Sequence, residues 1–161
     1  GGYVMGSSQA YREFGYRLSK ACNTAVIVPD YRLAPEAPFP AAVEDATAAY
    51  QALVKEIDPN RVVISGDSAG GGLAIATLLA VRDEGVPLPS AAFAISPLLD
   101  LAGTGESAET NAEADPLIDR NMVVEMGKVY IGELDPKATP LASPLYGDHK
   151  GLPPLLLLAS N

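Results

Sequence analysis

The stretch Val62-Val63-Ile64-Ser65-Gly66-Asp67-Ser68-Ala69-Gly70 decides the fold class. It opens with a short β-branched apolar run, which is typical of a buried strand. A glycine-rich turn follows at once, and residues 69–83 are rich in alanine and leucine, which predicts a helix. The pattern therefore predicts a strand, a sharp turn with Ser68 at its centre, and a helix that begins directly after the turn.

The same alternation of strands and helices continues on both sides of this stretch. Short apolar runs predict further strands at 25–28, 91–95 and 155–159. Apolar residues at helical spacing predict helices over 8–22, with Ser7 or Ser8 as the cap, and over 41–56, while Asp119 is placed to cap a helix through Tyr130. Residues 98–114 are predicted to be loop. Apolar strands separated by helices indicate an α/β fold, with a mostly parallel sheet and helices on both faces.

Composition limits the classes of partner. The chain has 161 residues, enough for one domain with an apolar core, and its formal net charge of −9 argues against nucleic acids and anionic membrane surfaces. No apolar run is long enough for stable membrane insertion, and without a visible export signal we expect a cytoplasmic protein. Cys22 is the only cysteine, which excludes an internal disulfide and a cysteine-based metal site, and we expect it to be buried at a helix end.

The motif Gly66-Asp67-Ser68-Ala69-Gly70 matches the pattern G-x-S-x-G, which is a weak signal alone and a stronger one between a strand and a helix. The sharp turn would lift the Ser68 hydroxyl above the sheet as a nucleophile. We expect side chains at Gly66 and Gly70 to collide with neighbouring backbone. The N–H of Ala69, at the helix N-terminus, would point at a developing oxyanion. A nucleotide-binding glycine-rich turn is disfavoured because no G-x-G-x-x-G or Walker pattern is present.

A serine hydroxyl needs a base to accept its proton, usually a histidine oriented by a carboxylate. His149 is the only histidine, and it lies in the polar loop 146–151 before the last predicted strand. That loop should lie at the amino end of the strand, whereas functional loops of such sheets lie at the carboxyl ends. Asp148 directly precedes His149, and adjacent residues cannot easily hydrogen-bond while the histidine also reaches Ser68. We therefore expect His149 to be an exposed loop residue.

Several motifs together resemble the hormone-sensitive-lipase-like, or bacterial type IV, esterases of the α/β-hydrolase superfamily. The resemblance covers the whole chain, with the motifs in the same order and spacing. The motifs are the serine turn, a loop after an earlier strand, the tail of a His-Gly-Gly-Gly motif and the entry to a late strand: Gly66-Asp67-Ser68-Ala69-Gly70-Gly71, Asp30-Tyr31-Arg32-Leu33-Ala34-Pro35-Glu36, Gly1-Gly2-Tyr3-Val4-Met5-Gly6-Ser7 and Leu152-Pro153-Pro154-Leu155-Leu156.

The resemblance implies an oxyanion hole and its supports. Gly1 and Gly2 correspond to the last two glycines of the His-Gly-Gly-Gly motif, and with Ala69 they would donate backbone N–H groups to the oxyanion. Bare glycine backbone would let the substrate carbonyl approach closely. The loop 31–36 and Asp67 would be structural supports of the serine turn.

The resemblance also implies what this chain lacks. The family's catalytic acid follows the strand predicted at 155–159, so Asp100 and Glu106 are expected to be loop or pocket-rim residues. On this basis residues 1–161 are the central fragment of a single α/β-hydrolase domain. It would lack the N-terminal cap and first strands, the motif histidine, and the C-terminal catalytic acid and histidine.

The implied function is hydrolysis of short-chain carboxylic esters through an acyl-enzyme on Ser68, without a cofactor or metal. The stretch 115–130 also resembles relatives that open lactones, so a lactone hydrolase is the alternative for the substrate. A non-catalytic ligand-binding relative and an acyltransferase stay open as other classes. The expected partner is a small ester or lactone, and a homodimer stays open for the longer parent. The 161-residue chain itself is expected to show negligible turnover, because it lacks the triad acid and histidine.

Overall fold

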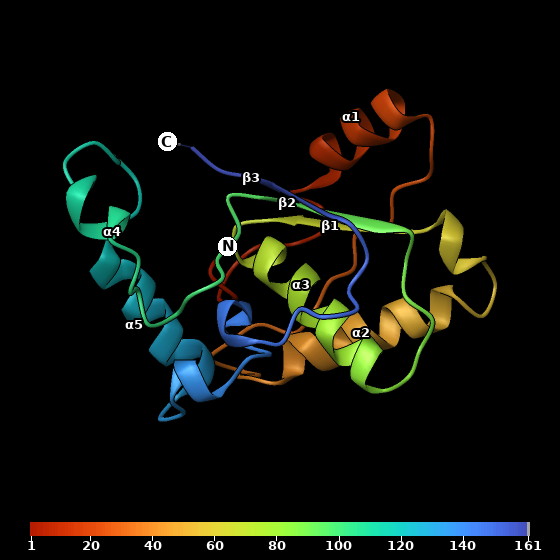
Figure 1. Cartoon of the computed structure of the whole chain (residues 1–161). Helices are drawn as coiled ribbons and strands as arrows, with labels where there is room; N and C mark the ends of the chain where they lie inside the picture. The colour runs from red at the N-terminus through yellow and green to blue at the C-terminus, as the bar shows by residue number, and fades with distance from the viewer. Residues whose placement is uncertain (161) are drawn as a thin grey trace.

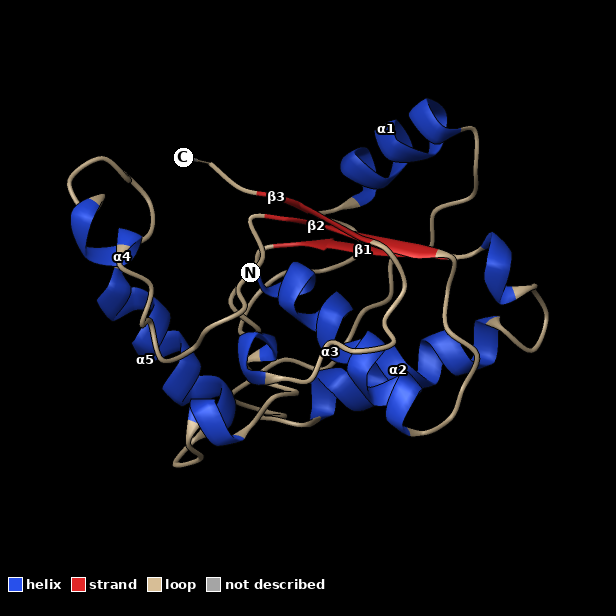
Figure 2. Cartoon of the chain, viewed as in Figure 1, coloured by secondary structure: helices blue, strands red, loops and turns tan. Residues whose placement is uncertain are grey.

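The computed structural model of the protein describes residues 1–160. Its sheet contains β1 (Val63–Asp67), β2 (Ala91–Ile95) and β3 (Leu155–Leu158), in the order β1-β2-β3 with both pairings parallel (Figure 2). The register aligns Asp67 with Ile95, and Ile95 with Leu158, so the carboxyl ends of the strands lie along one edge. The predicted strands at 91–95 and 155–159 are confirmed to within a residue, and β1 continues from Val63 into the glycine-rich motif.

Helices lie on both sides of this sheet, as predicted. In Figure 1, α2 and α3 lie on one side of the strands and α1 lies on the other. The helix α3 contacts β1, β2 and α2, so it forms the centre of the packed layer. The helices and helical turns are α1 (Arg12–Cys22), α2 (Ala41–Leu53), the 3-10 turn η1 (Pro59–Arg61), α3 (Ala69–Asp83), α4 (Ser107–Thr110), α5 (Arg120–Ile131), η2 (Pro136–Ala138) and η3 (Pro144–Tyr146).

The helix α3 supplies much of the core. From Ala69 to Val81 every residue except Gly70 is buried. Its alanines and leucines pack with residues of α2, with Tyr3 near the N-terminus of the chain and with Tyr130 of α5. Truncating a fully buried leucine such as Leu78 typically lowers stability by about 2–5 kcal/mol. This burial fixes the position of the N-terminus of α3, where Ser68 lies.

Two predictions about α1 are wrong. The helix begins at Arg12 and not at Ser8, because the Ser7 hydroxyl accepts from the Ala10 N–H in a preceding turn, while Ser8 binds Asp30 through its own N–H and hydroxyl. Cys22 is exposed and not buried. Gly15 is the buried residue of α1, and its missing Cβ would lie 3.4 Å from Val28, whereas Cys22 ends the helix two turns further along, beyond this contact.

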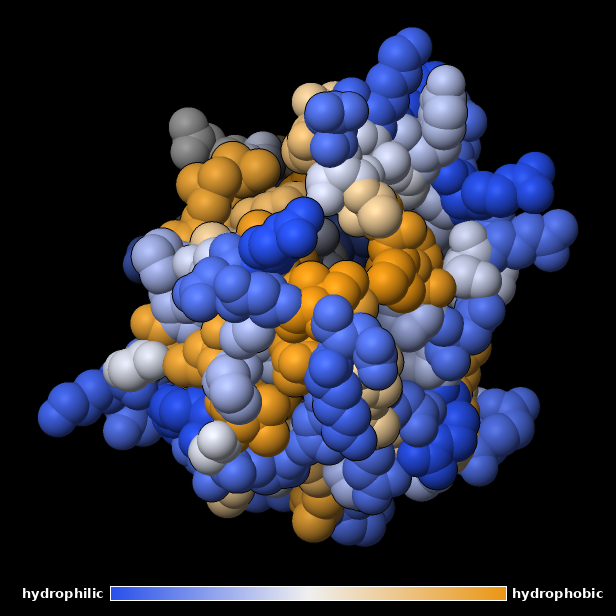
Figure 3. All heavy atoms as spheres, turned by 90° about the vertical axis from the view of Figure 1, so that its right-hand side faces the viewer, coloured by the Kyte–Doolittle hydropathy of each residue, from blue (hydrophilic) through white to orange (hydrophobic). Residues whose placement is uncertain are grey.

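The strand predicted at 25–28 is not part of the sheet. These residues are not assigned to a strand, and the sheet of residues 1–160 contains β1, β2 and β3. The segment makes side-chain contact with α1 instead, and Ile27 remains 68% exposed. Apolar surface is also visible in the middle of the face that Figure 3 turns toward the viewer. A β-branched run predicts an extended backbone, but a strand in a sheet also needs a neighbour that completes its hydrogen bonds.

The region after β2 follows the prediction with one addition. Residues 98–114 are loop except for the short helix α4. The predicted cap of α5 is confirmed, because the Asp119 side chain accepts a 2.8 Å hydrogen bond from the Met122 N–H. The helix predicted over 41–56 ends earlier, at Leu53.

Candidate active site

Ser68 lies between the last residue of β1 and the first residue of α3, with φ 52° and ψ −122°. A positive φ is unusual for a residue with a side chain and costs on the order of 1–3 kcal/mol. Three backbone hydrogen bonds hold it there. The Ser68 N–H donates to the Ile95 carbonyl oxygen at 3.0 Å, and the Ser68 carbonyl oxygen accepts from the N–H groups of Gly72 at 3.1 Å and Leu98 at 2.8 Å. The strained turn is therefore fixed to the end of β2.

Glycine is required around this turn by close backbone approach. A Cβ at Gly66 would lie 2.1 Å from the Gly70 carbonyl oxygen, and one at Gly72 would lie 2.2 Å from the Leu98 carbonyl oxygen. A Cβ at Gly71 would lie 2.8 Å from the Pro97 Cβ. The expectation of a collision at Gly70 is wrong, because among the described residues no heavy atom lies within 4 Å of a Cβ there. The requirement extends further into α3 than the motif indicates.

The turn formed by Gly1, Gly2 and Tyr3 lies beside the serine. A Cβ at Gly1 would be 3.9 Å from the Ser68 Oγ. The amino group of Gly1 donates to the Met5 carbonyl oxygen at 2.7 Å. Within residues 1–160, the N–H groups of Gly2 and Ala69 have no hydrogen-bond acceptor, and such free groups are usual at a helix N-terminus. Of the three predicted oxyanion donors, Gly2 and Ala69 thus have unpaired N–H groups and Gly1 does not.

His149 lies at the opposite end of α3 from Ser68. The Arg82 guanidinium, near the C-terminus of α3, donates to the carbonyl oxygens of Asp148 and Lys150, which flank the histidine. With a rise of about 1.5 Å per residue, Arg82 is roughly 20 Å along the helix from Ser68. His149 is exposed in this loop, as predicted, and it cannot reach the serine hydroxyl.

The two acids considered after β2 are loop residues. One Asp100 carboxylate oxygen accepts from the Ala102 N–H and the Tyr146 hydroxyl, and the other accepts from the N–H and hydroxyl of Thr104. Partial burial raises the pKa of Asp100, but these hydrogen bonds outweigh burial and leave the pKa below its ordinary value. Glu106 is exposed at the start of α4. Asp100 therefore orders its own loop, and no described histidine lies beside it.

The family described as alpha/beta hydrolase fold matches residues 1–161. The chain belongs to the α/β-hydrolase-fold family.

Similar proteins of this α/β-hydrolase-fold family include named esterases. An acetyl-hydrolase from Streptomyces hygroscopicus is 49% identical over 158 residues, which cover 98% of this chain and 52% of the relative. An esterase from Acinetobacter venetianus is 37% identical, with coverage of 98% and 52%. A crystal structure of an esterase from the bacterial hormone-sensitive lipase family superposes with a TM-score of 0.95 at 49% identity, covering 99% of this chain and 54% of that one. The predicted resemblance to that group is confirmed, and the chain spans about half the length of these relatives.

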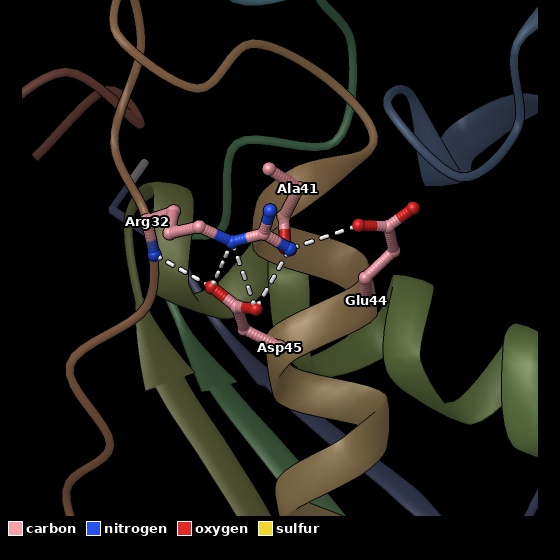
Figure 4. Close-up of polar contacts among 4 residues, drawn as sticks. All are labelled: Arg32, Ala41, Glu44 and Asp45. Atoms are coloured by element: carbon pink, nitrogen blue, oxygen red, sulfur yellow. Dashed lines mark hydrogen bonds and ion pairs between the residues drawn. The ribbon is translucent and has the colours of Figure 1, made fainter.

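Arg32 binds the loop 31–36 of this α/β-hydrolase-fold chain to the first turns of α2 through hydrogen bonds, as Figure 4 shows. The Arg32 guanidinium binds both carboxylate oxygens of Asp45, and it also reaches Glu44 at 2.8 Å and the Ala41 carbonyl oxygen. The Arg32 N–H adds a 2.8 Å bond to Asp45. These hydrogen bonds from Arg32 hold the pKa of Asp45 below its ordinary value. The predicted structural role of the loop agrees with these contacts.

Three residues near the site were not found by sequence reasoning. Tyr11 donates a hydrogen bond to Asp67, while Met126 and Tyr130 of α5 contact the turn that contains Gly2 and Tyr3. Each contact joins residues far apart in the chain, and a single sequence holds no signal for such pairs.

Over residues 1–160 there is no group of three or more metal-ligating side chains of His, Cys, Asp or Glu. In the same range no helix has the length and apolar content needed to cross a membrane.

Proposed function

We propose that this chain supplies the nucleophile and the oxyanion donors of a carboxylic ester hydrolase that works through an acyl-enzyme. The observation that carries the proposal is the strained Ser68 turn, tethered by three backbone hydrogen bonds beside the unpaired N–H groups of Gly2 and Ala69. Fixed N–H donors next to a nucleophile stabilise the negative charge that develops on a carbonyl oxygen, and they need no reorganisation during the reaction.

The reaction has two acyl-transfer steps. The Ser68 Oγ attacks the ester carbonyl carbon and its proton passes to a base, while the N–H groups of Gly2 and Ala69 hold the oxyanion. The carbon–oxygen bond to the alcohol then breaks, the alcohol leaves with the proton, and Ser68 remains acylated. Water, deprotonated by the same base, attacks the acyl group, and the carboxylic acid is released with Ser68 restored.

The base is not among the described residues near Ser68, because the single histidine is held at the other end of α3. We infer that the base and its orienting acid belong to a longer protein of which this chain is the central part, in keeping with relatives of about twice its length. The relative named acetyl-hydrolase supports a short acyl group in the substrate, because acetyl is the shortest of the common acyl groups.

Ser68→Ala in the longer protein tests this function, with p-nitrophenyl acetate as the substrate. We expect at least about a 10⁴-fold loss of kcat/KM, because the remaining oxyanion and binding contacts give only weak catalysis. Ser96→Ala is the matched control, since Ser96 directly follows the neighbouring strand β2 and also has a positive φ, of 43°. Full activity in the Ser68 variant, or hydrolysis of lactones with no hydrolysis of acyclic esters, would contradict the proposal.

A further inference from the structure

The turn beside Ser68 has a backbone conformation that local preference does not explain. Gly2 and Tyr3 have consecutive positive φ values of 67° and 64°. Glycine adopts this region freely, but tyrosine adopts it at a cost on the order of 1–3 kcal/mol. Tyr3 is nevertheless 1% exposed and belongs to the main core cluster. Such a conformation persists only where the surrounding structure determines it.

The helix α5 provides part of that surrounding structure. The rings of Tyr3 and Tyr130 are stacked with centroids 3.9 Å apart and an interplanar angle of 2°. Phe39 packs edge-on against Tyr130, with centroids 5.8 Å apart, and its N–H donates to the Tyr130 carbonyl oxygen at 2.8 Å. The Tyr3 carbonyl oxygen in turn accepts from the Ala34 N–H at 3.0 Å. The Tyr3 ring and backbone are thus both held from outside the turn.

A second contact from α5 reaches the preceding residue. A Cβ at Gly2 would lie 2.4 Å from the Met126 Sδ, so the thioether packs against the bare α-carbon of Gly2. Met126 and Tyr130 are four residues apart and therefore lie on the same face of α5. One helix face thus contacts two consecutive residues of the turn.

We propose that Tyr130, assisted by Met126, is a positioning residue that holds the Gly2 N–H in place for the oxyanion. The inference rests on the proposed function of Gly2. An oxyanion donor is effective only when it lies about 2.7–3.1 Å from the place where the charge develops. A turn with two left-handed residues would relax if the Tyr3 ring lost its stacking partner, and the Gly2 N–H would then move or become mobile.

The ring of Tyr130, and not its hydroxyl, performs this role. The hydroxyl oxygens of Tyr3 and Tyr130 are both buried without a hydrogen-bond partner among residues 1–160. Burial raises the pKa of the Tyr130 phenol, so it stays neutral at physiological pH. Removing the hydroxyl alone therefore removes no described hydrogen bond, whereas removing the ring removes the stack on Tyr3 and the edge contact with Phe39.

The experiment compares Tyr130→Phe and Tyr130→Leu in the longer protein, with steady-state hydrolysis of p-nitrophenyl acetate and inhibition by a trifluoromethyl ketone. Tyr130→Leu is expected to lower kcat about 10- to 100-fold with little change in KM, somewhat less than the loss of a whole oxyanion donor. The affinity for the ketone, whose adduct with serine carries an oxyanion, should fall in parallel. Tyr130→Phe is expected to retain kcat within about twofold, because no hydrogen bond is lost.

Tyr50→Leu is the matched control for a merely structural effect. Tyr50 is a buried tyrosine of α2 in a separate core cluster, with its hydroxyl bonded to the Pro87 carbonyl oxygen. Its loss should lower thermal stability and leave the kcat of the folded enzyme unchanged. An equal fall of kcat in Tyr50→Leu and Tyr130→Leu, or an unchanged kcat in Tyr130→Leu, would overturn the positioning role.

Hydrogen exchange separates a failure of this inference from a failure of the proposed function. Tyr130→Leu should speed exchange of the Gly2 and Tyr3 amides and leave the β1 amides protected, whether or not the protein hydrolyses esters. An unchanged exchange rate at Gly2 and Tyr3 would overturn the inference alone. An inactive wild-type protein with the expected exchange pattern would overturn the proposed function and retain the contact between α5 and the turn.

Discussion

The Tyr11 hydroxyl donates a 2.9 Å hydrogen bond to a carboxylate oxygen of Asp67, the residue directly before Ser68. The bond joins the turn that leads into α1 to the carboxyl end of β1, across 56 positions of sequence. Burial and this hydrogen bond raise the pKa of Tyr11, and burial together with the Asp67 charge raises the pKa of Tyr31. The Tyr11 hydrogen bond therefore joins Asp67, and with it the start of the serine turn, to the segment before α1.

Tyr11→Phe should lower the free energy of unfolding by about 1 kcal/mol, because it removes one partly buried hydrogen bond to a charged group. Tyr16→Phe is the control, since Tyr16 lies in the first turns of α1 close to Tyr11, is 61% exposed, and its hydroxyl has no hydrogen-bond partner among residues 1–160. Urea unfolding of both variants measures the difference. Equal stabilities for the two variants would show that the Tyr11 hydroxyl contributes nothing to the fold.

Gly66→Ala and Gly70→Ala should have opposite outcomes although both change the same motif. The Cβ at Gly66 would meet the Gly70 carbonyl oxygen at 2.1 Å, so we expect a loss of about 3 kcal/mol or more. The Cβ at Gly70 meets no described atom within 4 Å in the first turn of α3, so we expect a change between zero and about 1 kcal/mol of stabilisation. Thermal unfolding of the two variants measures the difference. An equal loss of stability in both would contradict the prediction.

Asp100→Asn should destabilise the protein in a pH-dependent manner. The pKa of Asp100 is depressed in the folded state, so its contribution is fully present above the unfolded pKa of about 3.9 and is lost as the pH falls through the lower folded value. We expect a loss of about 1 kcal/mol at neutral pH, which shrinks below about pH 4. Urea unfolding between neutral and acid pH measures this, with exposed Glu106→Gln as the control. If the stability difference between wild type and Asp100→Asn stayed constant with pH, the lowered folded-state pKa of Asp100 would be contradicted.

His149→Ala in the longer protein should leave ester hydrolysis unchanged within about twofold. The histidine's loop is held by Arg82, which lies roughly 20 Å along α3 from Ser68. The 161-residue chain alone should hydrolyse p-nitrophenyl acetate about 10⁴- to 10⁶-fold more slowly than the longer protein, since its described residues place no base at the serine. Rapid turnover by the chain alone that disappears in His149→Ala would overturn both expectations.

The local elements were predictable where a short stretch carries its own physical reason. The helix α3 begins and ends as its alanines and leucines predict, and Asp119 caps α5 because a carboxylate three residues before a free N–H is a local arrangement. The glycines of the serine turn were predicted only in part. Gly66 is needed as expected. Gly72 is also needed, because the Leu98 backbone lies beside it, whereas no described atom lies close enough to Gly70 to exclude a Cβ.

The sequence by itself determined that Ser68 lies on a sharp turn between a strand and a helix, because glycine spacing and hydrophobic periodicity act over a few residues. Only the tertiary structure decided that Tyr11 supports Asp67, that Tyr130 stacks on Tyr3, and that residues 25–28 stay outside the sheet. Those outcomes depend on which distant segments pack together. Packing is governed by shape and by completed hydrogen bonds across the folded chain, and neither is written in the order of neighbouring residues.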